Sequence, residues 1–215
     1  MVSVPSPSTF SAKAAPSRRE AKKSETRQAL IDAALELFAA AGYDQTGVEA
    51  IAERAGVSPR TFFRYFPSKE DVLFFGEYDY IRSFTGVYLA QPSSSTELQA
   101  IEASLLLLAP ALSRIKDRIV RYEQAIASSS LLRGREQGHH AQNERVIAGA
   151  VARRRGLTEP DNECRLLAVV SLSLLRHSLD RWLASPGADP RPFIETNFDS
   201  LRRLATIDRH RPASR

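Results

Sequence analysis

The sequence has 215 residues, the length of one domain or of a small module joined to a larger one. Hydrophobic residues make up 43% and charged residues 26%, which excludes a chain that is disordered throughout. Cys164 is the only cysteine, so an internal disulfide framework and a multi-cysteine zinc module are excluded. No apolar run reaches the roughly 18 residues of a membrane helix, and the N-terminus lacks the apolar core of a signal peptide. We therefore expect a cytoplasmic protein.

Most of the net charge of +5 lies at the N-terminus. Residues 1–23 contain five basic residues and one acidic residue, Glu20, and so carry +4 of the total. They are also rich in Ser, Pro and Ala, a composition that cannot build a core, and we predict a disordered basic arm over 1–23. Such an arm either reaches DNA phosphates or is a solubilising leader without contacts, and both interpretations stay open.

From residue 24 onward, apolar residues recur at three- and four-residue spacing, which predicts an amphipathic helix. Ser24 is its expected N-cap and Gly42 ends it. A second helix of about two turns is expected to follow a Thr46 cap and to stop at Gly56.

Ser58 and Pro59 open a third short helix, and Ser68 caps a longer one that runs towards Leu89. Beyond Pro92 the chain is predicted to be helical, with breaks at Pro110 and at later clusters of Ser, Gly and Pro. The later helices are expected at 96–112, 114–129, 131–155, 161–185 and 190–207. The predicted fold class is all-α with about nine helices, a DNA-binding domain at 24–70, a ligand-binding and dimerisation domain at 71–207 and a flexible tail at 208–215.

The second and third helices, joined by Ala55–Ser58, form a helix-turn-helix. The spacing over residues 24–75 resembles the N-terminal domain of the TetR family of bacterial regulators. The matching positions are Ala33-Ala34, Leu37-Phe38, Gly42, Thr46, Ile51-Ala52, Ala55–Ser58, Thr61, Tyr65-Phe66 and Lys69-Glu70. Phe63 departs from the pattern, because most of the family has Tyr there. The missing hydroxyl puts a phosphate contact in doubt, although the ring can still pack against the sugar backbone.

The outer face of the third helix carries the side chains expected to contact DNA: Ser58, Pro59, Arg60, Thr61, Phe63, Arg64 and Tyr65. Arg60 is the best candidate for base reading, since its forked donors match guanine O6 and N7. For Arg64, DNA contact and an ion pair within the protein are both open. The resemblance implies phosphate contacts by Thr61, Tyr65 and Lys69, and the helix capped by Thr46 is expected to point its N-terminus at the DNA backbone.

Residues 98–204 resemble the C-terminal domain of TetR-like regulators that bind acyl-CoA-like ligands, with Trp182 near the end of the penultimate helix and an arginine-rich stretch at 153–156. Side chains with apolar bodies and polar tips are the expected walls of an effector site: Tyr78, Phe84, Tyr88, Tyr122 and His177. The alternative is that these aromatic residues are plain core. Arginines such as Arg121 and 153–155 would meet an anionic headgroup.

The last two helices have more apolar surface than a solitary helix needs. We therefore predict a homodimer formed by these helices from each subunit. The expected interface residues are Leu167, Val170, Leu174, Trp182, Phe198 and Leu201. The alternative is a fully buried core helix in a monomer.

The sequence offers no convergent catalytic or metal-binding set. His139 and His140 are neighbours on a helix and diverge by about 100°, and Glu136 with His140 lacks a third ligand. We predict a repressor that binds a palindromic double-stranded operator and is released by a small, largely apolar effector, with no enzymatic activity, cofactor or metal. The alternatives are a constitutive or architectural DNA-binding protein without an effector and, third, an enzyme fused to a helix-turn-helix.

Overall fold

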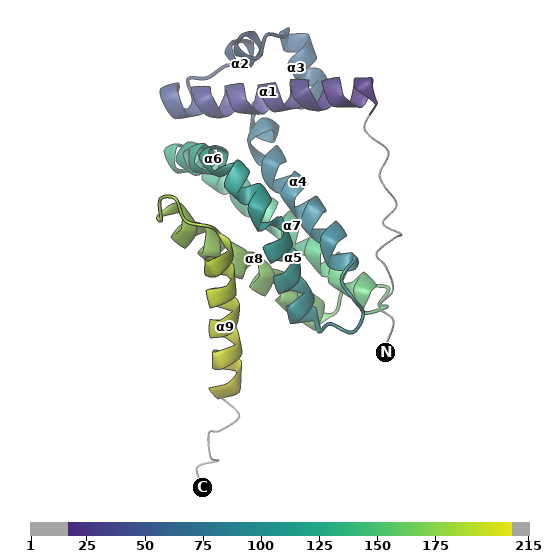
Figure 1. Ribbon diagram of the computed structural model, residues 1–215. Helices are drawn as coiled ribbons and strands as arrows, with labels where there is room; N and C mark the ends of the chain where they lie inside the picture. Colours follow the sequence, from purple (N-terminus) through teal and green to yellow (C-terminus); the bar gives the residue numbers. More distant parts are fainter. Residues whose placement is uncertain (1–16, 208–215) are drawn as a thin grey trace, which may run out of the picture.

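The computed structural model describes residues 17–207, and within that range the chain forms helices and no strand (Figure 1). The helices are α1 (Arg18–Ala41), α2 (Val48–Arg54), α3 (Pro59–Tyr65), α4 (Lys69–Leu89), α5 (Glu97–Arg114), α6 (Lys116–Ser128), α7 (Ser130–Arg154), α8 (Asn162–Leu183) and α9 (Arg191–Ile207). The predicted all-α class is confirmed. The expected tail at 208–215 and the first sixteen residues of the predicted arm lie outside the described residues.

The start of the first helix differs from the prediction. Ser17, not Ser24, is the N-cap, and α1 begins at Arg18, so the basic segment 18–23 is helical rather than disordered. The reason is a capping box, in which the Glu20 amide donates to Ser17 Oγ at 3.3 Å and the Ser17 amide donates to the Glu20 carboxylate at 2.8 Å. Two orphan amides of the first turn are satisfied in this way.

The turns of the N-terminal unit follow the predicted glycines and caps. Gly42 and Gly56 have φ of 83° and 68°, a region that favours glycine. Gly42 is the C-cap of α1, and Gly56 lies in the turn that follows α2. Ser58 caps α3, with Pro59 in the first turn. The Thr46 cap is wrong: Gly47 is the N-cap of α2, and the buried Thr46 hydroxyl donates to the Gly42 carbonyl at 2.8 Å.

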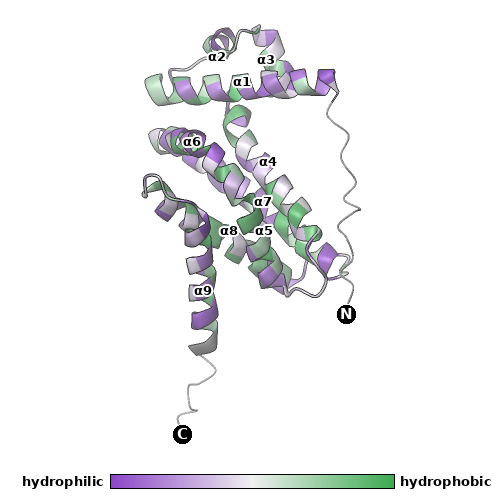
Figure 2. Cartoon of the chain, viewed as in Figure 1, coloured by the Kyte–Doolittle hydropathy of each residue, from purple (hydrophilic) through white to green (hydrophobic). Residues whose placement is uncertain are grey.

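Two buried clusters share α4. The first half of α4, with Val72, Leu73 and Phe74, packs with α1, α2, α3 and the ends of α6 and α7. The second half, with Phe84 and Tyr88, packs with α5, α7, α8 and α9. The helix-turn-helix unit and the C-terminal bundle are therefore joined by packed side chains along α4. Figure 2 shows apolar residues concentrated on α5 and the second half of α4.

The boundaries of the later helices agree with the predicted ranges to within about two residues. Pro110 differs, because it lies inside α5 instead of separating two helices. The break comes at Ile115, where α5 and α6 are bent by 85°. Between residues 17 and 207, no single helix is long and apolar enough to cross a membrane. Only α5 and α6 counted together, despite their bend, reach that length and apolar composition.

Candidate nucleic-acid interface and effector cavity

The face of α3 that points away from the core carries three exposed side chains, Arg60, Phe63 and Arg64. Their spacing of three and four residues places them on one side of the helix. Phe63 is 55% exposed and is the one exposed large apolar side chain within residues 17–74. The arrangement presents two guanidinium groups around an apolar ring, which suits hydrogen bonding to base edges or phosphates together with apolar contact in the groove.

Buried aromatic residues hold α3 against the rest of the unit. Phe62 is fully buried, and its ring lies 5.8 Å from that of Phe66. Ser58 Oγ accepts from the Thr61 amide at 3.2 Å, so the predicted DNA-contacting residues Ser58 and Thr61 also hold the first turn of the helix. This packing leaves α3 rigid, as a helix that reads a groove must be.

Lys69 has a structural role that the sequence did not reveal. Its Nζ donates to the carbonyls of Tyr43 at 2.8 Å and Thr46 at 3.1 Å, and it lies 3.9 Å from the centre of the Tyr43 ring. The ammonium group thus ties the turn between α1 and α2 to the start of α4. Because the Thr46 side chain is buried, this turn offers backbone groups rather than the Thr46 hydroxyl to a partner.

Tyr65, at the end of α3, is half-buried beside two arginines. The Arg27 guanidinium lies 5.9 Å from the Tyr65 ring and 4.8 Å from the Phe75 ring, and the Arg64 guanidinium lies 5.4 Å from the Tyr65 ring. Arg64 therefore has an aromatic neighbour and, among the described residues, no ion pair. Arg27 connects α1 to the end of α3 and to the second turn of α4 by cation–π contacts.

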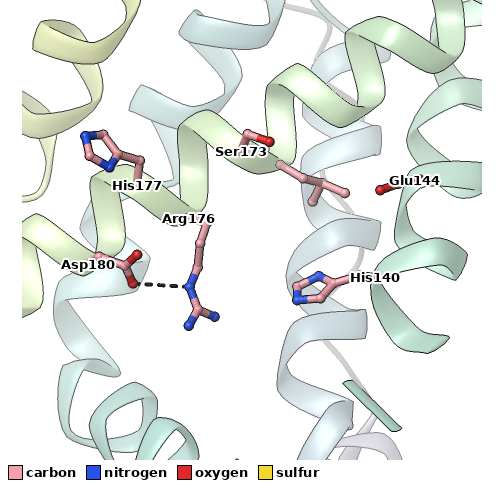
Figure 3. A pocket seen from close by; sticks show the side chains of 7 residues that line it. His140, Glu144, Ser173, Arg176, His177 and Asp180 are labelled. Atoms are coloured by element: carbon pink, nitrogen blue, oxygen red, sulfur yellow. Dashed lines mark ion pairs between the residues drawn. The ribbon is translucent and has the colours of Figure 1, made fainter. Parts of the chain in front are cut away.

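A hollow of about 520 Å³ lies between α7 and α8. Figure 3 shows His140 and Glu144 on one side of it and Ser173, Arg176, His177 and Asp180 on the other. Arg176 Nε and the Asp180 carboxylate are 3.2 Å apart. Six of the seven lining residues are polar or charged and Leu172 is the apolar one, but much of the surface they present to the hollow is the hydrocarbon part of their side chains.

A carboxylate network adjoins this hollow. Glu77 accepts from Asn143 Nδ2 at 2.6 Å, Glu123 accepts from Arg176 at 3.0 Å, and a buried oxygen of Glu136 lies 3.7 Å from Arg176. Burial raises the pKa of Glu77 and of Glu123 above the ordinary glutamate value, since water is lost around the charged form. Within the described part of the chain, no group of three or more His, Cys, Asp or Glu side chains is placed to hold a metal ion.

Comparisons with known proteins agree with this architecture. A family profile described as "Bacterial regulatory proteins, tetR family" matches residues 30–74, and one described as "MftR C-terminal domain" matches residues 98–205. The HTH-type transcriptional regulator TcmR of Streptomyces glaucescens is 30% identical over 227 residues, which cover 97% of this chain and 96% of TcmR. This chain belongs to the TetR family.

Solved structures show the same fold. FadR of Thermus thermophilus, a TetR-family repressor crystallised with lauroyl-CoA, is 26% identical, with a TM-score of 0.52 over 83% of this chain and 93% of FadR. A TetR-family regulator from Syntrophomonas wolfei superposes with a TM-score of 0.61 at 19% identity, over 86% of this chain and 96% of that one. The TetR-family all-α fold with its N-terminal helix-turn-helix is thus confirmed.

The residues predicted to line an effector site do not surround one cavity in this TetR-family chain. His177 lines the hollow, and Tyr122 lies beside the carboxylate network with its hydroxyl 3.5 Å from Glu77. Tyr78 is 55% exposed. Phe84 and Tyr88 are buried with their rings stacked, and the Tyr88 hydroxyl donates to Glu97. These two aromatic residues pack as plain core, the alternative that the sequence left open.

The arginine-rich stretch is largely engaged within the protein. Arg154 donates to the carbonyls of Gln91 and Pro92 at 2.8 and 2.6 Å and holds the loop between α4 and α5. Arg155 forms ion pairs with Asp161 at 3.0 Å and Glu163 at 2.7 Å. Arg153 and Arg121 are exposed. Of the arginines suggested for an anionic headgroup, only Arg121 and Arg153 are therefore exposed to a ligand.

A second connection between the DNA-binding unit and the bundle runs from α1 to α6. Arg118 donates through Nε and Nη2 to the two oxygens of Asp32, at 2.6 and 2.9 Å. Such a bidentate pair fixes both distance and orientation. The position of α1 therefore depends on α6 as well as on the continuous helix α4.

Two of the predicted dimer residues are wrong, because Trp182 and Phe198 are buried within the chain itself. Leu167 and Leu174 are half-buried and pack against the same core, and Val170 and Leu201 are half-buried. Between residues 162 and 205, the large apolar side chains that face outward on α8 and α9 are Leu166, Val169 and Leu204, at 58%, 41% and 65% exposed. The outward apolar face of α8 is thus displaced by one residue from the predicted one.

Proposed function

We propose that this TetR-family protein is a transcriptional repressor that acts in the cytoplasm and binds a palindromic DNA operator as a homodimer. The observation that carries the proposal is the exposed face of α3, where Arg60, Phe63 and Arg64 lie together on a helix held by buried aromatics. Regulators of this kind place such a helix in the major groove, and a two-fold dimer reads two half-sites one helical turn or a multiple of it apart.

Within this proposal, Arg60 reads a base and the other members of the face position the helix. The Arg60 side chain is exposed and forms no ion pair in the described chain, so both edges of its guanidinium are available for guanine O6 and N7. Ser58, Pro59, Thr61, Tyr65 and Lys69 are proposed to contact the DNA backbone or to hold the groups that do. Phe63 supplies apolar contact in place of the tyrosine hydroxyl of its relatives.

The test begins with selection of bound duplexes from a randomised DNA pool by the full chain. On the selected operator, Arg60→Ala is expected to lose about 1–3 kcal/mol of discrimination at one base pair of each half-site, because a bidentate contact is removed. Competition binding with operators substituted at each position measures this. Arg114→Ala, at an exposed arginine at the end of α5, is the matched control. Equal weakening on every sequence would contradict base reading by Arg60.

We further propose that a small, largely apolar effector releases the protein from DNA. FadR, crystallised with lauroyl-CoA, supports an acyl-CoA-like ligand. The carboxylate network beside the hollow joins α4 to α7 and α6 to α8. Of these helices, α4 follows α3 directly, and α6 holds α1 through Arg118 and Asp32. A ligand that separates these helices would move α1 and α3. By linkage, a ligand that prefers the shifted state weakens DNA binding by the same factor.

Titration of lauroyl-CoA into the protein–operator complex is expected to weaken DNA binding by about 5–150-fold, the usual range of coupling between sites. Fluorescence anisotropy of a labelled operator measures the loss, and a thermal shift of the protein alone measures ligand binding. CoA without an acyl chain is the control for the headgroup. Ligand binding without any change in DNA affinity would favour the second candidate, a constitutive DNA-binding regulator. The observation that supports this candidate is that Phe84 and Tyr88 stack in the core instead of lining a cavity.

A further inference from the structure

The first turns of α1 form a surface that the helix-turn-helix motif does not include. The tetR family profile begins at residue 30, whereas α1 begins at Arg18. The capping box of Ser17 and Glu20 makes these turns regular helix. We call the basic side chains of this segment the α1 ridge, which consists of Arg18, Arg19, Lys22 and Lys23.

The α1 ridge is exposed and strongly basic. All four of its side chains are exposed, and none forms an ion pair with another residue of the range 17–207. At 100° per residue they fall within about 140° of the helix circumference, so they form one face rather than a ring. Figure 2 shows the same end of α1 as strongly hydrophilic.

The charges of the ridge oppose the helix that carries them. The N-terminal end of a helix is the positive end of its dipole, where acidic side chains are stabilising and basic ones are not. Four cations in the first six helical residues, against the single acid Glu20, are therefore unfavourable for the isolated protein. A bound anion would relieve both the mutual repulsion of the cations and the clash with the dipole.

The ridge lies about one turn along α1 from a contact with the end of α3. Arg27, four residues beyond Lys23, lies over the rings of Tyr65 and Phe75, and Tyr65 is the last residue of α3. From Arg27 back to Arg18 the helix extends about 13 Å. Figure 1 shows that this N-terminal part of α1 continues past α3 at the end of the molecule formed by α1, α2 and α3.

We propose that the α1 ridge binds DNA phosphates just outside the base pairs that α3 reads. This inference rests on the proposed function, because it needs α3 in the groove. The ridge is a rigid row of cations about 8 Å long from Arg18 to Lys23, so it spans about two phosphate steps of one strand, at about 3.4 Å per nucleotide along the axis. The contact is electrostatic and carries no base preference, so it adds affinity and register without altering the sequence that is recognised.

The test replaces the whole ridge by glutamine, in the variant R18Q/R19Q/K22Q/K23Q of the full chain. Glutamine keeps a high helix propensity, so α1 is retained. Binding to the selected operator with native-length flanks is measured between low and moderate salt. The slope of log K against log salt is negative, and each lost phosphate contact reduces its steepness by about 0.9, so loss of one or two contacts per protomer reduces the steepness by about 2–4 for the dimer.

Two controls separate the ridge from general charge effects. The variant R82Q/R114Q/R145Q/R181Q removes four exposed charges from the C-terminal bundle and is expected to leave most of the slope unchanged. The variant R18K/R19K/K22R/K23R keeps the charge of the ridge and should restore wild-type binding. On a duplex trimmed to the bases that α3 reads, the wild-type and glutamine variants are expected to bind alike.

An unchanged salt slope on the long duplex would overturn the proposal, and so would an equal loss for the bundle variant. Failure of the proposed function gives a different result, since no operator is then selected or binding does not depend on Arg60. If selection succeeds and depends on Arg60 while the ridge variant binds like wild type, only the ridge assignment fails.

Discussion

Replacing Trp182 by alanine is expected to lower the free energy of unfolding by about 3–5 kcal/mol, the usual cost of truncating a buried Trp. The indole is 1% exposed, and its Nε1 donates to the Ala188 carbonyl at 2.8 Å. Lys116 Nζ lies 4.8 Å from the ring and 3.2 Å from the Ser185 carbonyl. The substitution therefore opens a cavity and releases the contacts that hold the turn between α8 and α9.

Chemical denaturation at several protein concentrations measures this change. Leu107→Ala, at a 65% exposed position of α5, is the control and is expected to change the stability by no more than about 0.5 kcal/mol. A Trp182→Ala protein as stable as wild type would contradict a core role. If its only defect were dissociation into folded monomers, Trp182 would instead belong to the subunit interface.

The difference between the predicted and the observed face of α8 has a physical reason. The buried face of α8 follows Cys164, Ala168, Ser171, Leu175 and Ser178. It therefore includes two serines, whereas hydropathy alone favours burial of the leucines beside them. Ser171 and Ser178 donate to the carbonyls of Leu167 and Leu174 at 2.6 and 2.7 Å, which satisfies their hydroxyls within the helix. Small buried residues let helices approach closely, and hydropathy alone does not show this.

Local signals in the sequence predicted the DNA-binding unit well. The Ser58 cap, Pro59 in the first turn of α3 and the glycines at 42 and 56 each act over a few residues, and each lies where expected. The early start of α1 was also readable, because Ser17 and Glu20 have the spacing of a capping box. The Pro, Ser and Ala residues before it favoured the prediction of a disordered arm over 1–23 instead.

Contacts between distant residues could not be predicted in this way. Lys69 binds carbonyls more than twenty positions earlier in the chain, and Arg118 pairs with Asp32 across 86 positions. The proposed effector site depends on the same kind of information, since the hollow is formed by side chains from α7 and α8 whose packing is set by the whole bundle. Helical spacing identified the aromatic residues but did not indicate which of them would be buried in the core.

Aspartate at the outward apolar face of α8, in the variant Leu166→Asp/Val169→Asp, is expected to convert the proposed dimer into folded monomers. Both side chains are exposed in the protomer, so the protomer loses little of its own packing. In the dimer the same positions would lie against their copies, because a two-fold interface pairs one patch with itself. Four carboxylates would then be buried without partners, which strongly opposes association.

Sedimentation measures the expected halving of mass, and circular dichroism checks that the helices remain. Operator affinity should fall by about 100-fold or more, because a monomer loses the effective concentration that links the two half-sites, whereas binding to an isolated half-site should not change. Leu107→Asp places the same charge at a 65% exposed position of α5 and should leave the dimer intact. A double-aspartate protein that still sediments as a dimer would move the interface away from this face of α8, and the exposed apolar residue Leu204 of α9 would be the next position to change.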